Sequence, residues 1–189
     1  SLNSVSGTFS GTPLNSDVGS LSVEVTAFDG VASVSDVFSI VVSNANDAPT
    51  VISGIADQGA VEDVLFSLDV SPNFGDVDAG DTLSFSVRLE GGDPLPAWLG
   101  VGDVSGVLSG TPLNGDVGSL SIEVTASDGE ESASGIFTLT VSNANDAPVL
   151  LSAIADQTAP EDVLFALDVS SNFGDSDTGD VLSFSGTLE

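Results

Sequence analysis

Two short stretches of this chain each carry three closely spaced aspartates around a glycine. The sets are Asp76, Asp78 and Asp81, and Asp175, Asp177 and Asp180. Calcium is a hard cation that binds roughly six to eight oxygen ligands, often including several carboxylates. Like charges this close cost free energy unless a cation neutralises them, although a solvated acidic turn is the alternative interpretation. The spacing therefore predicts a Ca²⁺ site in each stretch.

Catalysis has little to work with in this sequence. The chain contains no His, Cys or Lys, so its many serines lack the usual base that would make one of them a nucleophile. Paired carboxylates can hydrolyse glycosides, but here the acids recur along the chain instead of belonging to one predicted cleft. We therefore expect the chain not to be an enzyme.

The composition excludes other classes of function. Asp and Glu number 29 against one basic residue, Arg88, which gives a net charge of −28. Such a charge excludes binding to nucleic acid and disfavours anionic lipid surfaces, whereas it favours multivalent cations. With 41% hydrophobic and only 16% charged residues, the chain has enough apolar material for packed cores. No apolar stretch reaches the roughly 18 residues of a membrane span, so no membrane insertion is expected.

The elements that position the aspartates must recur, because the sequence repeats itself every 99 residues. The run Ser-Gly-Thr-Pro-Leu-Asn begins at Ser10 and again at Ser109, and Asn-Ala-Asn-Asp-Ala-Pro begins at Asn44 and again at Asn143. The second motif ends in proline and reads as a linker. We predict the C-terminal half of a repeat at residues 1–49, a complete repeat at 50–148 and the N-terminal half of another at 149–189.

Apolar and polar residues alternate at period two within the complete repeat. The clearest runs are 83–89, 120–126 and 136–141, and the run 65–70 alternates less cleanly. Ser, Thr and Val dominate, turn residues separate the runs, and no helical periodicity is present. About seven such strands per repeat predict an all-β fold of tandem β-sandwiches. Trp98 is expected to pack in or beside the core.

The chain resembles the dystroglycan-type, cadherin-like domains of bacterial surface proteins. The matching motifs are Glu-Asp at 62–63, Phe-Gly-Asp-x-Asp at 74–78, Leu-Pro-Ala-Trp-Leu at 95–99, Ser-Gly-Thr-Pro at 109–112, Val-Thr-Ala-Ser-Asp-Gly at 124–129 and the linker motif at 143–148. They span the complete repeat in the family's order. The resemblance implies immunoglobulin-like Greek-key sandwiches joined end to end, as in long adhesins and some polysaccharide-degrading proteins. In cadherins themselves, calcium binds between successive domains.

The resemblance also implies which oxygen ligands meet at each linker. At the first linker they are Asn44, Asn46, Asp47, Asp76, Asp78, Asp81 and Asp128. At the second they are Glu62, Asn143, Asn145, Asp146, Asp175, Asp177 and Asp180. The linker departs from the cadherin pattern Asp-x-Asn-Asp-Asn, because it reads Asn-x-Asn-Asp-Ala, and Asp17 and Asp116 match a further cadherin acidic motif poorly. We therefore expect fewer ions per linker, weaker binding, or both.

These observations predict a calcium-stiffened structural repeat of a secreted or cell-surface, fibre-like bacterial protein. Its expected partners are calcium and neighbouring repeats. The two half repeats belong either to a longer array or to separate chains that complement each other head to tail and form an extracellular filament. In the second case Asp29 of the next copy would take the position of Asp128. A further alternative is a carbohydrate-binding accessory module that recognises cell-surface glycans.

Overall fold

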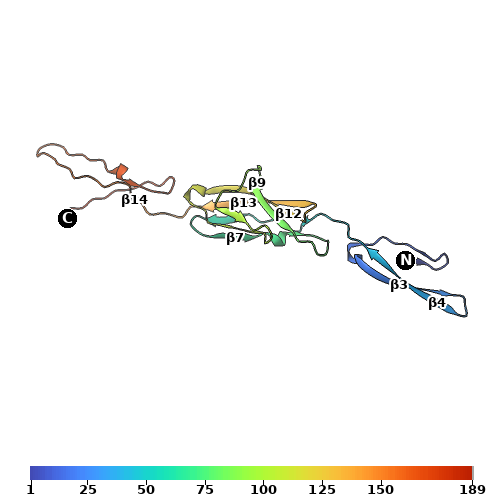
Figure 1. The fold of residues 1–189 in the computed structure, drawn as a ribbon. Helices are drawn as coiled ribbons and strands as arrows, with labels where there is room; N and C mark the ends of the chain where they lie inside the picture. Colours follow the sequence, from blue (N-terminus) through green and yellow to red (C-terminus); the bar gives the residue numbers. More distant parts are fainter. Residues whose placement is uncertain (189) are drawn as a thin grey trace.

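The computed structural model describes residues 1–188, so Glu189, the last residue of the predicted third segment, lies outside the described residues. Three parts follow one another in a row, and the two termini lie in the outer parts (Figure 1). We call residues 50–148 the central repeat, 1–43 the N-terminal arm and 149–188 the C-terminal arm. The first linker is 44–49 and the second 143–148. Within residues 1–188 no helix is long and apolar enough to cross a membrane.

The central repeat is a sandwich of two main sheets. One has the strand order β6-β13-β12-β9 and the other β10-β11-β7, so seven strands form the body. Their bounds are β6 Gln58–Val61, β7 Phe66–Asp69, β9 Ser84–Leu89, β10 Leu99–Val101, β11 Val107–Gly110, β12 Gly118–Ser127 and β13 Ser132–Ser142. The pair β13 and β6 is parallel, and the other neighbours are antiparallel. The prediction of an all-β sandwich is thereby confirmed.

The period-two pattern explains the core. In β12 the alternate residues Ile122, Val124 and Ala126 point inward and are fully buried, while the residues between them are partly exposed. Successive side chains of a strand point to opposite faces, so one face of each sheet packs and the other meets solvent. Phe66, on the other sheet, belongs to the same buried cluster. Trp98 packs against this cluster and is partly buried, as predicted.

Short elements complete the central repeat. They are β5 Thr50–Val51, the 3₁₀ turn η2 Ser71–Asn73, β8 Phe74–Gly75 and the 3₁₀ turn η3 Asn114–Asp116. β5 follows Pro49 directly and pairs with β8, whose next residue is Asp76. This pairing holds the beginning of the first aspartate stretch beside the end of the first linker.

Each arm reproduces part of the same pattern without its partner sheets. The N-terminal arm contains β1 Leu2–Asn3, β2 Thr8–Phe9, the turn η1 Asn15–Asp17, and the long hairpin of β3 Gly19–Phe28 and β4 Ser33–Val42. The C-terminal arm contains β14 Val149–Leu150, the turn η4 Ser170–Asn172 and β15 Phe173–Gly174, with β14 paired to β15. Many apolar residues of the arms are exposed, because nothing in the described structure covers them.

Candidate metal centres at the two linkers

The first acidic loop, residues 76–81, meets the first linker through backbone and side-chain hydrogen bonds. The N–H of Asp47 donates to Oδ2 of Asp78 over 2.7 Å. The amide of Asn15 donates to Oδ2 of Asp47 over 2.7 Å and, more weakly, to Oδ1 of Asp78 at 3.4 Å. The N-terminal arm, the linker and the central repeat therefore meet at one point.

The three aspartates of this loop face one another. One oxygen from each of Asp76, Asp78 and Asp81 lies within 4.8 Å of the others. Asp78 is buried, and the N–H of Asp78 donates to Oδ1 of Asp76 over 2.9 Å, while Oδ2 of Asp76 is buried without a hydrogen-bond partner among the described residues. The loop can close this tightly because Gly80 has φ +108°, a conformation that disfavours residues with a side chain.

Asp128 reaches the same linker from the turn between β12 and β13. Its Oδ2 accepts a 3.0 Å hydrogen bond from the amide of Asn46. Its Oδ1 accepts the backbone N–H groups of Glu131 and Glu130, both at 2.7 Å. These backbone bonds, with the Asn46 amide, hold the pKa of Asp128 below its usual value, so its side chain is an anion at neutral pH.

The second junction repeats the first at the same register. The N–H of Asp146 donates to Oδ2 of Asp177 over 2.7 Å, and the amide of Asn114 bonds Asp146 at 2.6 Å and Asp177 at 3.4 Å. Oxygens of Asp175, Asp177 and Asp180 lie within 4.8 Å of one another. The second acidic loop, residues 175–180, therefore meets the second linker as the first loop meets the first linker.

Glu62 adds a buried carboxylate to the second junction. Its side chain is fully buried, and Oε1 accepts the backbone N–H of Ala144 over 2.6 Å. Oε2 is buried and has no hydrogen-bond partner among residues 1–188. The N–H of Glu62 also donates to the carbonyl of Ser142, which fixes this residue at the point where β13 passes into the linker.

The remaining predicted ligands are less engaged. Asn44 and Asn143 are exposed, and within residues 1–188 no hydrogen bond of their side chains is found. The amide of Asn145 donates to the carbonyl of Asp146 at 2.7 Å, unlike Asn46, which reaches an aspartate of the following repeat. Contact with the linkers is thus shown for most of the predicted set, and metal ligation by all of them stays a prediction.

Asn15 and Asn114 are the junction residues that the sequence analysis missed. Both end the run Ser-Gly-Thr-Pro-Leu-Asn, so their recurrence was a visible signal that was not connected with the metal. Asp17 and Asp116, considered as substitutes for a cadherin motif, accept the backbone N–H groups of Leu14 and Leu113. They close the turns η1 and η3 that carry the two asparagines.

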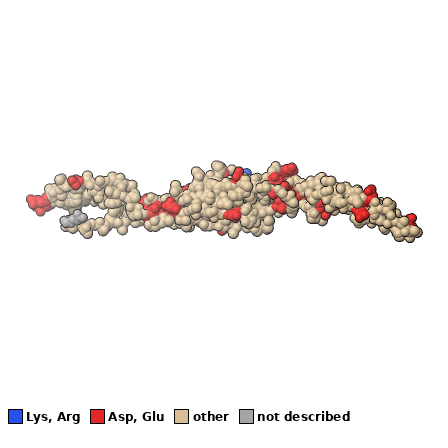
Figure 2. Space-filling view, turned by 60° about the horizontal axis from the view of Figure 1, so that its bottom comes forward, with Lys and Arg blue, Asp and Glu red and all other residues tan. Residues whose placement is uncertain are grey.

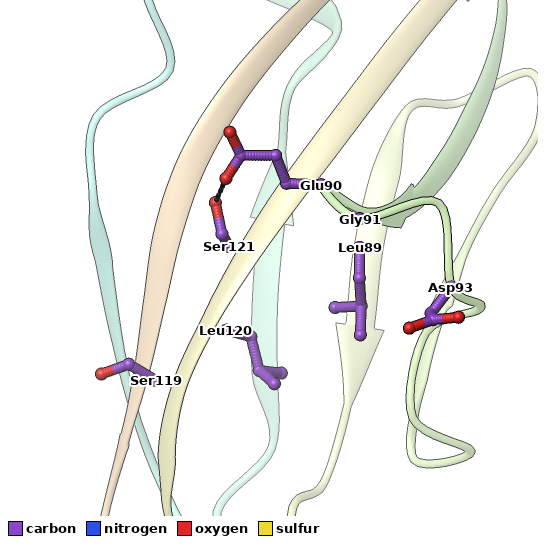
Figure 3. Close-up of a pocket in the computed structure, with 7 residues that line it drawn as sticks. All are labelled: Leu89, Glu90, Gly91, Asp93, Ser119, Leu120 and Ser121. Atoms are coloured by element: carbon purple, nitrogen blue, oxygen red, sulfur yellow. Dashed lines mark hydrogen bonds between the residues drawn. The ribbon is translucent and has the colours of Figure 1, made fainter.

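A hollow of about 480 Å³ beside β9 contains no comparable constellation. Its lining is drawn in Figure 3, where Glu90 turns toward Ser121 and Asp93 points away from both. Glu90 accepts the hydroxyl of Ser121 over 2.6 Å. The two carboxylates do not converge on a common point, so the hollow does not have the geometry of a glycosidase pair.

The junction residues fit a hard divalent cation. Each acidic loop offers carboxylate oxygens, and buried oxygens of Asp76 and Glu62 have no protein partner. The chain's one basic side chain, Arg88, bonds Glu123 at 2.7 Å on the central repeat, so it does not neutralise either junction. Figure 2 shows acidic side chains gathered on both sides of the thick central part. A bound cation would supply the positive charge that the protein does not provide.

Two sheets packed face to face, in tandem units joined by short linkers, define the class of immunoglobulin-like β-sandwich arrays. The chain belongs to the family described as "Putative Ig domain", whose model matches residues 1–43 and 48–142. No curated protein sequence matches the chain significantly.

Several solved structures are similar to this chain. An endo-fucoidan hydrolase from glycoside hydrolase family 107 is 25% identical over 74% of this chain, with a TM-score of 0.44. The match covers 22% of that hydrolase, so the chain spans about a fifth of its length. Extracellular cadherin domains 1–4 of protocadherin gamma B7 are 19% identical over 77% of this chain and 37% of theirs, with a TM-score of 0.49. A SusE-like surface-located polysaccharide-binding protein from Bacteroides thetaiotaomicron is 24% identical over 48% and 14%, with a TM-score of 0.37.

Proposed function

We propose that this chain is a structural repeat of an extracellular, fibre-like bacterial surface protein or adhesin, stiffened by Ca²⁺ at the linkers between domains. The observation that carries the proposal is the identical junction at both linkers. Asp47 bonds Asp78 and Asn15, and 99 residues later Asp146 bonds Asp177 and Asn114. A structure that recurs at every joint serves the array as a whole.

The stiffening follows from electrostatics at each joint. Without a cation, the carboxylates of the acidic loop and the linker repel each other, and the joint bends freely. A bound Ca²⁺ neutralises them and holds the linker, through Asp47 or Asp146, against the loop of the next repeat. Each filled site stabilises the bound form by about 2.7 kcal/mol when free calcium exceeds its dissociation constant a hundredfold. Extracellular calcium sites typically bind in the range of about 0.1–1 mM.

The first prediction concerns binding and thermal stability. Wild type should bind Ca²⁺ in calorimetric titrations, and its melting temperature should rise by several degrees in Ca²⁺ but not in Mg²⁺ or EDTA at equal ionic strength. The variant Asp76→Asn/Asp78→Asn should lose the sites of the first linker only, which about halves the number of bound ions. Adding Asp175→Asn and Asp177→Asn should abolish binding, because both loops then lack their central charges.

The matched control is Asp93→Asn/Asp103→Asn, which removes two charges from exposed loops away from both linkers. It should bind calcium like wild type. Equal melting of wild type in calcium, magnesium and EDTA, without binding heat, would refute the proposal and leave the aspartates as a solvated surface.

A carbohydrate-binding module has no comparable support. Such modules need an exposed aromatic platform, whereas the aromatic side chains of residues 50–148 belong to the core: Phe66, Phe74, Phe85 and Phe137 are buried and Trp98 packs against them. The alternative of a self-assembling filament is different, because the two arms carry an observation that favours it.

A further inference from the structure

The arms expose apolar side chains whose counterparts in the central repeat are buried. In the N-terminal arm Ile40 is 37% exposed, while Leu139, at the same position of the next repeat, is fully buried. In the C-terminal arm Phe165 is 50% exposed, while its counterpart Phe66 is 7% exposed. The uncovered faces are therefore the inner faces of a sandwich, and each arm presents the one that the other lacks.

The N-terminal arm has a hollow where its missing strands would lie. The hollow measures about 500 Å³, and Phe9, Gly11, Pro13, Leu21, Ile40 and Val42 are among the residues that line it. In the central repeat the same positions are occupied by β6 and β7. There Val141 pairs with Ala60 and Gly110 with Phe66.

We propose that a second copy of this chain fills that hollow with its C-terminal arm, so that two arms complete one sandwich. The occupant follows from the chain itself, because residues 50–90 cover the counterpart surface and 149–188 repeat their sequence 99 positions later. Transferring the pairing of the central repeat predicts the register. Gly11 should pair with Phe165 of the second copy and Val42 with its Ala159.

Docking of the second copy also completes the two junctions. In the central repeat Glu62 is fully buried and accepts the N–H of Ala144, whereas the counterpart Glu161 is exposed. Glu161 is prearranged, because Asp63 and Asp162, which follow the two glutamates, share a positive φ of 58° and 62°. In the assembly Glu161 of a second copy would reach the first linker of this one at Ala45, the counterpart of Ala144.

Asp29 plays the reciprocal part at the second linker. Its Oδ1 accepts the N–H groups of Val31 and Ala32, both at 2.8 Å, as Asp128 accepts those of its own turn. At the first linker Asn46 donates to Asp128, but Asn145 has only the neighbouring carbonyl. Asp29 of a second copy would give Asn145 its missing partner. This completion of the junctions rests on the proposed calcium function, whereas the apolar docking does not.

Head-to-tail docking is heterologous, so it propagates. Each copy has one arm of each kind, and a contact that uses different surfaces on the two partners builds an open filament unless it closes into a ring. Complementation also covers the unpaired strand edges of the arms, which would otherwise pair without specificity. Two docked arms bring no counterpart of Trp98, so we expect the shared sandwich to melt below the central repeat.

Sedimentation velocity of the 189-residue chain over a series of concentrations, in EDTA with moderate salt, tests the docking alone. Wild type should form species larger than one chain. Ile40→Asp and Phe165→Asp should each remain single chains, since each places a charge on one docking face. The matched controls are Val41→Asp and Leu164→Asp, adjacent residues whose counterparts Thr140 and Leu65 stay exposed in the central repeat. Both should assemble like wild type.

An equimolar mixture of Ile40→Asp and Phe165→Asp should form a dimer that grows no further, because one intact head meets one intact tail. This result also shows that both variants are folded. A single-chain wild type at every concentration would overturn the docking proposal, and so would assembly that all four variants retain, since that indicates unspecific aggregation.

Calcium then tests the junctions separately. In wild-type assemblies Asp29→Asn and Glu161→Gln should weaken calcium binding, while neither should change it in the Ile40→Asp background. Unchanged binding in the assembly would refute the completion of the junctions without touching the docking. Assembly without any calcium binding would refute the calcium function alone.

Discussion

Glu62 and Glu161 show how one residue type acquires different properties at two equivalent positions. Glu62 is fully buried with one carboxylate oxygen bonded to Ala144 and the other unpartnered, whereas Glu161 is exposed. A buried charged oxygen without a partner costs free energy, which a protein recovers only if something binds there. The burial of Glu62 therefore makes it the more informative of the acidic residues at the second linker.

The variant Glu62→Gln should have opposite effects on stability and on calcium binding. In EDTA it should raise the free energy of unfolding of the central repeat by about 1 kcal/mol, because it removes a buried charge and keeps the acceptor for Ala144. In Ca²⁺ it should weaken binding at the second linker. Thermal unfolding and calorimetric titration measure the two effects.

Glu161→Gln in the single-chain Ile40→Asp background is the matched control, since Glu161 is exposed there. It should change neither quantity. If Glu62→Gln lowers stability in EDTA and leaves calcium binding intact, Glu62 has a structural role only.

At the scale of elements, several very short ones place the acidic loop. β7 ends at Asp69, the turn η2 follows, and β8 then delivers Asp76 beside the linker. Oδ1 of Asp69 accepts the hydroxyl of Ser71 at 2.7 Å and its N–H at 2.9 Å. These two bonds begin the turn and hold the pKa of Asp69 below its usual value of 3.8, the hydroxyl having the larger effect.

Asp69→Ala should lower the melting temperature of the central repeat by a few degrees at neutral pH. Because the pKa of Asp69 is lowered in the folded state, its stabilisation is present above pH 3.8 and is lost as the pH falls through the folded-state value. The difference from wild type should therefore shrink below pH 3.8. Melting curves across pH in metal-free buffer measure it.

Asp93→Ala serves as the comparison, since it removes an exposed carboxylate from a loop without disturbing a turn. It should melt like wild type at every pH. A difference for Asp69→Ala that persists unchanged in acid would assign the effect to side-chain packing rather than to the charge.

At the scale of the whole molecule, the chain is a row of sandwiches whose charge is concentrated at the joints (Figure 2). A net charge of −28 with one arginine favours an extended chain by repulsion alone. Salt screens exposed charges beyond about 8 Å at physiological ionic strength, so repulsion between distant parts cannot fix the angle at a linker. A bound ion acts at contact distance and can.

Small-angle scattering of the single-chain Ile40→Asp variant should therefore respond to calcium. We expect a larger maximum dimension and a narrower distribution of shapes in Ca²⁺ than in EDTA, and no such change in Mg²⁺ at equal ionic strength. With Asp76, Asp78, Asp175 and Asp177 also replaced by Asn, the response should disappear. Identical curves with and without calcium before this replacement would show that the joints are not stiffened.

Local patterns were sufficient to predict the elements and the acidic loops. The alternation at 120–126 and 136–141 identified β12 and β13, and the close aspartates were visible as spacing alone. The contacts of Asn15 and Asn114 were not predictable in this way. Asn114 lies 32 residues from Asp146 and 63 from Asp177, and no local pattern relates such positions.

The sequence by itself determined a repeated all-β chain with recurring groups of carboxylates, because periodicity and spacing are properties of adjacent residues. Only the tertiary structure decided which carboxylates meet a linker and which are buried. Glu62 and Glu161 lie in the same motif, yet one is enclosed and the other exposed. The physical reason is that burial and hydrogen bonding depend on the strands that cover a residue, and those strands come from a distant part of the repeat.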